Sequence, residues 1–205
     1  MNFSVFFRNF FYRLMTELTL QLKKLRPALG VVLCVFVWLC PHELRAQSAQ
    51  TNEQSMKAGF VYNFALFAEW PAKVFKDIRS PLAICIAADK ATVQVFEPLT
   101  TKKILGRSVA VHAFGDNATR YPCHIIYIDS KNKAEAAELL HLVSGPGVLT
   151  IGDLEGFCQL GGIVNFYHEN NKLRFEINTD AARRADIKLS SQLLKLAKIV
   201  KEEKP

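Results

Sequence analysis

The chain has 205 residues, of which 26 are Lys or Arg and 19 are Asp or Glu, a formal net charge of +7. Much of that charge is N-terminal: residues 47–205 carry 20 basic and 17 acidic side chains, a net charge of +3. This balance argues against a nucleic-acid-binding protein. Residues 47–205 are the right size for one domain with a single sizeable core.

The N-terminal segment has the pattern of a secretory signal peptide. Basic residues at Lys23–Arg26 precede an apolar run, Ala28–Leu39, which a proline and a polar stretch follow. The run is too short to cross a bilayer, which takes about 20 apolar residues. The alternative is a buried core helix. We expect residues 1–46 to be a cleaved signal peptide, with Met15 as an alternative start, and residues 47–205 to form an exported domain.

The first part of this domain alternates predicted helices and strands. Apolar residues recur at helical spacing in the first segment and form short runs between turn signals in the others. The predicted elements are helix Thr51–Trp70, strand Pro81–Ala88, helix Ala91–Leu99, strands Arg107–Phe114 and Cys123–Ile128, helix Lys131–Leu142 and strand Gly147–Ile151.

The last part begins with a glycine-rich loop, Gly152–Gly162. A β-hairpin follows, since two strand-like runs flank a tight polar turn. The expected elements are strands Ile163–His168 and Lys172–Asn178, helix Asp180–Ala185 and an amphipathic helix Ser190–Lys201 with Leu193, Leu194, Leu196 and Ile199 inward. The pattern predicts a single α/β domain with a mixed β-sheet, helices on both faces, and a C-terminal hairpin followed by helices.

Three cysteines follow the predicted signal peptide. Cys85 lies inside a predicted buried strand and Cys123 opens another, so a disulfide is feasible if the two strands are neighbours. Two separate buried thiols are the alternative. Cys158 is then left over on the glycine-rich loop, either buried and inert or exposed and sensitive to oxidation.

No group of residues has the pattern of an active site. The four histidines of the exported domain are His112, His124, His141 and His168, and none has metal-ligand spacing. The glycine-containing turns lack the residues of a phosphate-binding loop, and there is no GxSxG motif. We therefore expect a protein that is not an enzyme and that uses neither a metal nor a cofactor.

Two segments carry a specific resemblance to a known family. One is KAGFVYNFALFAEWP with the strand LAICI; the other is GGIVNF with KLRFEIN, DAARRA and LSSQLL. They begin at Lys57, Leu82, Gly161, Lys172, Asp180 and Leu189. In order and spacing these segments resemble the YfiR family of small exported proteins of Gram-negative bacteria. The resemblance extends from about Met56 to Lys198.

The resemblance implies regulation. Proteins similar to this one repress an inner-membrane diguanylate cyclase by binding its periplasmic portion, which lowers cyclic di-GMP and biofilm formation. An outer-membrane lipoprotein that binds peptidoglycan can sequester the repressor. Cys85 and Cys123 match the family's paired cysteines, so the resemblance implies a disulfide. Cys158 matches one member of a second pair, but Ile151 stands at about the place of its partner.

Four residues are candidates for binding a partner. Trp70 is either an exposed anchor or a core cap for the first helix. Phe157 is either covered by a partner or folded back onto the domain. Arg183 and Arg184 are adjacent in a predicted helix and cannot both face inward, so one is expected to pair with Asp180 or Glu176 and the other to be available.

Two further functions remain open from the sequence. One is a periplasmic small-molecule sensor with a pocket at the glycine-rich loop beside Arg183 or Arg184. The other is an exported enzyme that uses Cys158. The sequence also leaves open whether the protein forms a homodimer.

Overall fold

The computed structural model describes residues 43–115 and 122–201. The chain divides into two compact units, residues 1–50 and 51–205. Of the first unit, only the start of helix α2 (Glu43–Leu66) is described. The basic segment and apolar run of the predicted signal peptide lie outside the described residues. In the part of the chain that is described, no helix is both long enough and apolar enough to cross a membrane.

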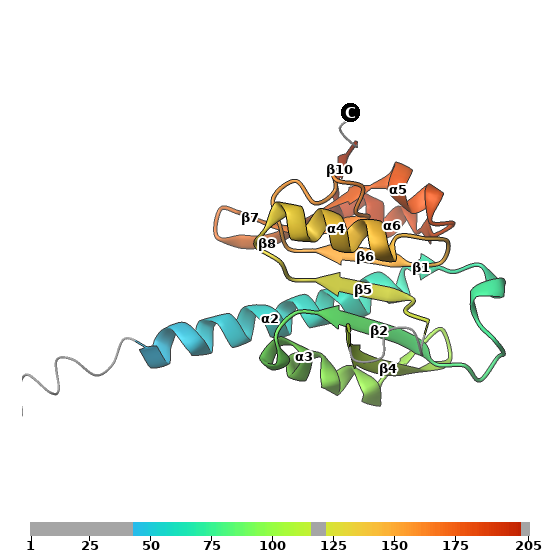
Figure 1. Cartoon of the computed structure of the whole chain (residues 1–205), viewed down its shortest axis with the longest axis horizontal. Coiled ribbons are helices and arrows are strands. Elements are labelled where there is room, and N and C mark those ends of the chain that lie inside the picture. The colour runs from blue at the N-terminus through green and yellow to red at the C-terminus, as the bar shows by residue number, and fades with distance from the viewer. Residues whose placement is uncertain (1–42, 116–121, 202–205) are drawn as a thin grey trace, which may run out of the picture. The chain divides into compact units, whose positions relative to one another are not determined.

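The described part of the second unit contains an eight-stranded mixed sheet (Figure 1). Its strands are β2 (Leu82–Ala87), β3 (Lys103–Ile104), β4 (Arg107–Ala113), β5 (Ile125–Ile128), β6 (Leu149–Gly152), β7 (Val164–Glu169), β8 (Lys172–Asn178) and β10 (Lys198–Val200), in the order β10-β8-β7-β6-β5-β2-β4-β3. The five strands from β7 to β4 in this order are parallel. A separate two-stranded ribbon pairs β1 (Ala68–Glu69) with β9 (Lys188–Leu189).

Four of the α-helices, α3 to α6, begin directly after a polar residue that caps them. Asp89, Asn132, Asn178 and Ser190 each accept a backbone N–H bond at a helix N-terminus. After α2, the helices in the described part of the chain are η1 (Ala72–Val74), α3 (Lys90–Phe96), η2 (Glu97–Thr101), α4 (Lys133–Val143), α5 (Thr179–Arg184) and α6 (Ser191–Leu196).

The strand order places helices on opposite faces of the sheet. The chain moves in one direction from β2 to β4 and in the other from β5 to β6, and right-handed crossovers then put α3 and α4 on different faces. In Figure 1, α4 lies in front of the strands and α2 behind them. The predicted α/β fold, with a mixed sheet and helices on both faces, is confirmed.

The face that α2 and α3 cover, here called the α2 face, holds the larger core. Phe60 and Phe64 of α2 meet Phe166 and Phe175 of the hairpin, with ring centroids 4.9 to 6.0 Å apart. Phe96 of α3 joins the same core. Burying each such ring removes 150–250 Å² from water, so this cluster dominates the stability of the fold (about 25 cal/mol per Å²).

The opposite face, here called the α4 face, holds a smaller core. Its buried members are Cys85, Ile126, Ile128, Leu140 and Phe157. The side chains alternate along the strands, so Ile125 and Tyr127 belong to the α2 face while their neighbours in β5 belong to the α4 face. This explains why the central strands are apolar runs: both of their faces are buried.

The prediction for the C-terminus is wrong beyond Leu196. Helix α6 ends there, and β10 pairs in parallel with β8 instead of continuing the helix. Leu193 is buried, as expected, but Leu196 and Ile199 are 74% and 49% exposed. The edge of β8 offers unpaired backbone groups, and the β-branched pair Ile199–Val200 favours a strand there.

Candidate functional site

The glycine-rich loop folds back onto the α4 face through Phe157. The ring of Phe157 is 0% exposed and packs in the smaller core. A methyl group at Gly152 or Gly162 would collide with this ring, so both positions require glycine. Phe157 was a candidate for binding a partner. Its burial contradicts that prediction, and the alternative in which it folds back onto the domain is the one observed.

Cys158, next to Phe157, is a buried free thiol. Its Sγ lies 3.6 Å from the carbonyl oxygen of Ile163 and 3.7 Å from that of Glu176. Burial, followed by the nearby charge of Glu176, raises the pKa of the Cys158 thiol far above its usual range. A neutral, enclosed thiol is a poor nucleophile and is protected from oxidation, which favours the inert alternative.

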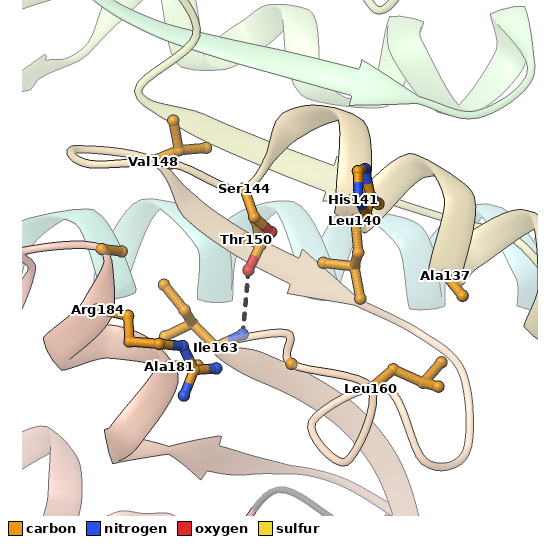
Figure 2. Close-up of a pocket in the computed structure, with 13 residues that line it drawn as sticks. Ala137, Leu140, His141, Ser144, Val148, Thr150, Leu160, Ile163, Ala181 and Arg184 are labelled. Atoms are coloured by element: carbon orange, nitrogen blue, oxygen red, sulfur yellow. Dashed lines mark hydrogen bonds between the residues drawn. The ribbon is translucent and has the colours of Figure 1, made fainter. Parts of the chain in front are cut away.

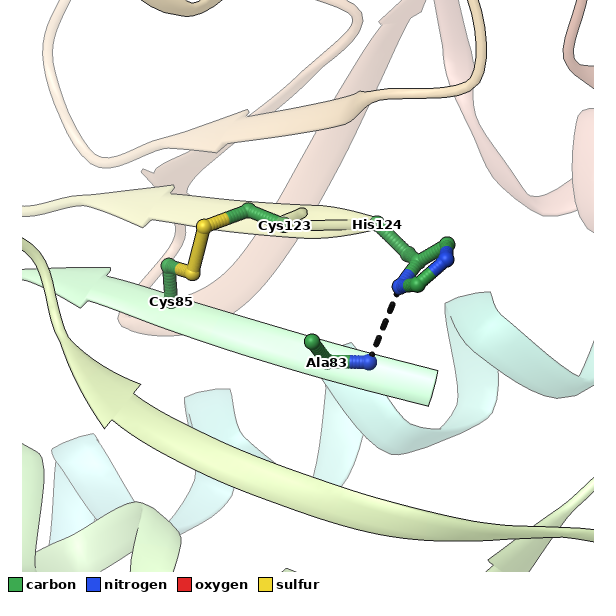
Figure 3. The surroundings of a disulfide bond; sticks show 4 residues. All are labelled: Ala83, Cys85, Cys123 and His124. Carbon is green, nitrogen blue, oxygen red and sulfur yellow. Dashed lines mark hydrogen bonds between the residues drawn. A yellow bond between two sulfur atoms is a disulfide. The ribbon is translucent and has the colours of Figure 1, made fainter. Parts of the chain in front are cut away.

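Cys85 and Cys123 form a disulfide between β2 and the residues that lead into β5 (Figure 3). Their Cα atoms are 5.8 Å apart, within the usual range. The neighbouring His124 turns away from the sulfur atoms, and its Nδ1 accepts a hydrogen bond of 3.0 Å from the N–H of Ala83. Burial lowers the pKa of His124. The histidine therefore acts as a neutral structural group that joins β2 to the start of β5.

Trp70 lies beside this junction. Its side chain is half-buried against the α2-face core, and its Nε1 donates a 3.3 Å hydrogen bond to the carbonyl oxygen of His124. The polar atom of the indole is thus satisfied within the domain. These contacts favour a role as a cap after helix α2 over a role as an exposed anchor.

The two adjacent arginines of α5 point to different surroundings. Arg183 pairs with Asp180, with 3.1 Å between Nη1 and Oδ1, and borders a small cavity next to β9. Arg184 is exposed and borders a larger groove on the other side of α5. Of the two partners expected for one arginine of this pair, Asp180 is the one observed, and it pairs with Arg183.

The groove beside Arg184 has a volume of about 500 Å³ and is open to solvent (Figure 2). Its walls are α4, α5 and the end of the glycine-rich loop, and its floor is formed by residues of β6 and the start of β7. The lining residues are Ala137, Leu140, His141, Ser144, Gly145, Val148, Thr150, Leu160, Gly161, Ile163, Ala181, Arg184 and Ala185. The lining is mostly apolar or small, with His141 and Arg184 as its basic groups.

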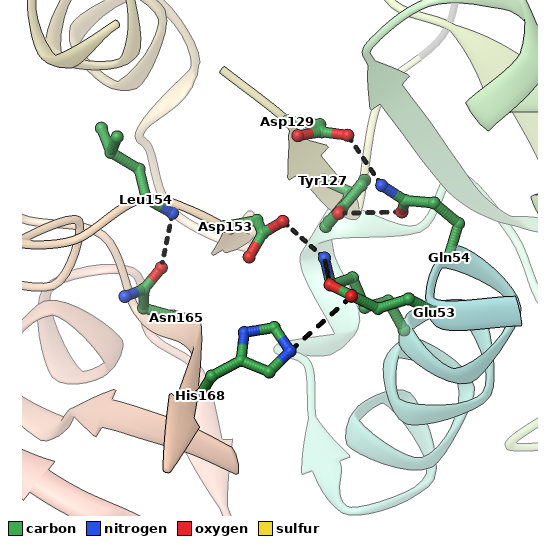
Figure 4. A network of polar contacts seen from close by, with 9 residues as sticks. Glu53, Gln54, Tyr127, Asp129, Asp153, Leu154, Asn165 and His168 are labelled. Carbon is green, nitrogen blue, oxygen red and sulfur yellow. Dashed lines mark hydrogen bonds and ion pairs between the residues drawn. The ribbon is translucent and has the colours of Figure 1, made fainter. Parts of the chain in front are cut away.

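A second cluster of polar residues lies at the carboxyl ends of β5 and β6 (Figure 4). The Lys57 side chain is 3% exposed, and its Nζ lies 2.5 Å from Asp153 Oδ2 and 2.6 Å from Glu53 Oε1. Burial lowers the pKa of Lys57, but the hydrogen bonds and charges of Asp153 and Glu53 outweigh it and raise the pKa. The bond from Lys57 lowers the pKa of Glu53. Lys57 is thus a paired ammonium, not a base.

The same cluster continues to β5. The Nε2 of Gln54 donates a 2.9 Å hydrogen bond to Asp129 Oδ2, and the hydroxyl of Tyr127 donates to Gln54 Oε1 at 3.2 Å. Burial, with the charge of Asp153, raises the pKa of Asp129. These bonds fasten α2 to the end of the sheet and to the glycine-rich loop, a structural role.

Sequence reasoning missed this cluster, although one signal was present. Lys57 stands between apolar positions on the inward side of α2, where a cation is buried only if it is paired. Its partner Asp153 lies 96 residues further along the chain, so spacing could not identify it. Within residues 43–115 and 122–201, no group of three or more His, Cys, Asp or Glu side chains could hold a metal ion.

Comparison with known proteins identifies the family of the chain. No curated protein matches the chain significantly. A family model described as YfiR/HmsC-like matches residues 54–198, which include the central sheet up to the first residue of β10 and all the residues that line the groove. Proteins of this family are periplasmic and are regulators rather than enzymes, and the Cys85–Cys123 disulfide fits an oxidising compartment. The chain belongs to the YfiR/HmsC-like family, which indicates a periplasmic regulator of cyclic di-GMP signalling.

Proposed function

We propose that the protein represses a membrane-bound diguanylate cyclase by binding the cyclase's periplasmic portion, and so lowers cyclic di-GMP and biofilm formation. The observation that carries the proposal is the family match over residues 54–198. In this proposal residues 1–46 are a signal peptide that exports the domain. A lipoprotein of the outer membrane that binds peptidoglycan would compete for the repressor.

The mechanism is a population shift. A repressor that binds one conformation of the cyclase's periplasmic portion stabilises that conformation by its differential affinity, and no chemistry is needed. The polar groups at the carboxyl ends of β5 and β6 are consistent with this mechanism, because they are paired with one another. The groove on the α4 face has an unfilled volume of about 500 Å³.

The experiment is a measurement of cyclic di-GMP in the source bacterium after deletion of the gene. We expect cyclic di-GMP to rise, to return to its original level when the protein is restored with its export signal, and to stay high when residues 47–205 are produced in the cytoplasm. An unchanged level after deletion, across several growth conditions, would refute the proposal.

The groove also favours a second candidate, a periplasmic small-molecule sensor. Its volume of about 500 Å³ is within the range of small-molecule sites, about 300–1,000 Å³, and it lies at the glycine-rich loop beside Arg184. A thermal-shift screen of the purified domain distinguishes the candidates, because a ligand raises the unfolding midpoint by mass action. The sensor candidate predicts a saturable shift that substitution of Arg184 abolishes.

A further inference from the structure

The connection from β1 to β2 holds an isoleucine out in solvent. Ile78 is 86% exposed, the highest value among the large hydrophobic side chains that the structure describes. In Figure 1 this connection is the long loop at the right. Exposed cations stand on both sides of the isoleucine, at Lys76 and Arg79. Ile78 therefore contributes little to the core of the domain itself.

This loop is fastened to the domain, which fixes the exposure of Ile78. Asp77 Oδ1 accepts hydrogen bonds of 2.7 and 2.8 Å from the N–H groups of Arg79 and Ser80. Nη1 of Arg107, on β4, donates hydrogen bonds of 2.8 to 3.1 Å to three carbonyl oxygens of the loop, those of Asp77, Ile78 and Ser80. A loop that is already held in one conformation loses little conformational entropy on binding.

A second apolar side chain lies level with Ile78. β2 and β4 are parallel neighbours with Leu82 opposite Val109. Ile78 and Leu105 each lie four residues before these positions, at the amino ends of the two strands. Leu105 is 53% exposed and opens the two-residue turn between β3 and β4, with a φ of 50° that is followed by 79° at Gly106. Such turns favour Asn, Asp or Gly, so neither burial nor the turn accounts for a leucine here.

The two segments that carry these apolar tips are strongly basic. Residues 71–80 and 97–107 hold six basic and two acidic side chains, a net charge of +4. Residues 47–205 as a whole carry +3, so the remainder of that region is slightly acidic. Four exposed cations of these segments make no ion pair with another described residue, namely Lys76, Arg79, Lys102 and Lys103. This end of the sheet therefore attracts an anionic surface.

We propose that residues 76–80 and 102–107 dock on the anionic phospholipid surface of the inner membrane, on its periplasmic side, with Ile78 and Leu105 inserted among the headgroups. Protruding apolar side chains surrounded by cations combine insertion with attraction to anionic lipid. A protein partner is instead expected to cover a hollow or a continuous apolar patch, and neither the groove nor the small cavity next to β9 includes these residues. The inference does not rest on repression of a cyclase.

The test is co-sedimentation of the protein, purified after export, with vesicles of phosphatidylglycerol mixed with phosphatidylcholine, or of phosphatidylcholine alone. We expect binding to the anionic vesicles that weakens as salt is added, and little binding to the neutral ones. Absence of binding to anionic vesicles at low salt would overturn the inference and leave an acidic protein surface as the partner of this end of the sheet.

A matched pair of double charge reversals locates the docking surface. Lys76→Glu with Arg79→Glu should lower the partition coefficient at least about tenfold, because each cation near an anionic surface contributes several-fold. Lys90→Glu with Lys133→Glu makes the same change of charge where α3 and α4 begin, at the carboxyl ends of the strands. That change should cost less than about threefold, because it lies more than a screening length away. Equal losses for the two double variants would overturn the inference.

Three apolar-to-polar variants test the insertion. Ile78→Asn should lower the partition coefficient at least about fivefold, since the inserted side chain is lost. Leu105→Asn should also weaken binding, yet keep or raise the unfolding temperature, because Asn is favoured at a positive φ in this turn. Leu142→Asn, at a leucine that is 72% exposed on α4, is the control and should leave binding unchanged. Unchanged binding by Ile78→Asn and Leu105→Asn, or an equal loss in Leu142→Asn, would overturn the insertion of these two tips.

Discussion

The two faces of the central sheet are closed to different degrees. On the α2 face, α2 and α3 cover a core that includes four mutually packed phenylalanines. On the α4 face, α4 and the folded-back glycine-rich loop cover a smaller core and leave a groove. The strands are shared, so the difference comes from the connections between them. A doubly wound sheet can thus have its larger core on one face and leave a groove on the other.

The largest effect is expected on the closed face. Phe64 is 1% exposed and packs against three other rings, so Phe64→Ala should lower the free energy of unfolding by about 3–5 kcal/mol. Phe67→Ala, at a ring that is 38% exposed, should cost at most about 1 kcal/mol. Chemical denaturation measures both. Similar losses at the two positions would contradict the assignment of the main core.

The next effect concerns the disulfide between β2 and the start of β5. The Cys85→Ala and Cys123→Ala double variant should lose up to about 4 kcal/mol in the chain-entropy model, because the bond spans 38 residues. Dithiothreitol should have a similar effect on the wild type and none on the variant. Cys158→Ala should leave the sensitivity to dithiothreitol unchanged. Wild-type stability that does not respond to dithiothreitol would contradict a stabilising bond.

A smaller effect tests how the α4 face is covered. Gly162→Ala should cost about 1–3 kcal/mol, because the added methyl group would displace the ring of Phe157. Gly59→Ala is the matched control: a methyl group there meets nothing within 4 Å, and alanine should stabilise helix α2 by up to about 1 kcal/mol. Thermal unfolding of the two variants should move in opposite directions. A neutral Gly162→Ala would show that Phe157 does not fill this place.

The smallest expected effect is a pH dependence of the stability that comes from Asp129, directly after β5. The raised pKa of Asp129 means that the folded protein binds this proton more tightly than the unfolded chain, whose value is near 3.8. This term therefore lowers stability as pH rises through the raised pKa. Asp129→Asn should raise the stability at neutral pH, by at most about 1 kcal/mol because the site is partly exposed, and should give no gain below pH 3.8.

At Glu53 the pH dependence of stability has the opposite sign. Its pKa is lowered by Lys57, so its contribution is present above the unfolded value of 4.5 and is lost as pH falls through the folded pKa. Glu53→Gln should therefore destabilise the protein at neutral pH. Titration of the unfolding temperature separates the two variants. A loss of stability in Asp129→Asn at neutral pH would contradict the burial of that carboxyl group.

The sequence was sufficient for the strands of four or more residues and for most of the α-helices, because both patterns are local. The short strands β1, β3 and β9 were not predicted. The runs around Ile84, Ile126 and Leu149 are short and lie between turn signals, which is typical of strands buried on both faces, and the hairpin turn was recognisable at Asn170–Asn171. The C-terminal strand β10 was missed, since its pairing with β8 depends on a free sheet edge that no local pattern reveals.

The candidate site was less accessible from the sequence. The sequence indicated the glycine-rich loop and Arg184 as parts of a site. Whether Phe157 is buried or exposed depended on the space next to Gly152 and Gly162, which only the tertiary structure shows. The pairing of Lys57 with Asp153 joins residues distant in sequence for the same reason. The residues that line the groove come from four separate segments of the chain, so no local pattern predicts it.

The central claim is that the exported domain represses a membrane-bound diguanylate cyclase, which rests on the family match over residues 54–198. The most direct test measures cyclic di-GMP in the deletion strain after restoring the protein with its export signal or residues 47–205 without one. With both proteins at equal levels, we predict that the exported protein restores repression and that the cytoplasmic protein leaves cyclic di-GMP at the level of the deletion strain. Full repression by the cytoplasmic protein, or no repression by the exported one, would contradict the claim.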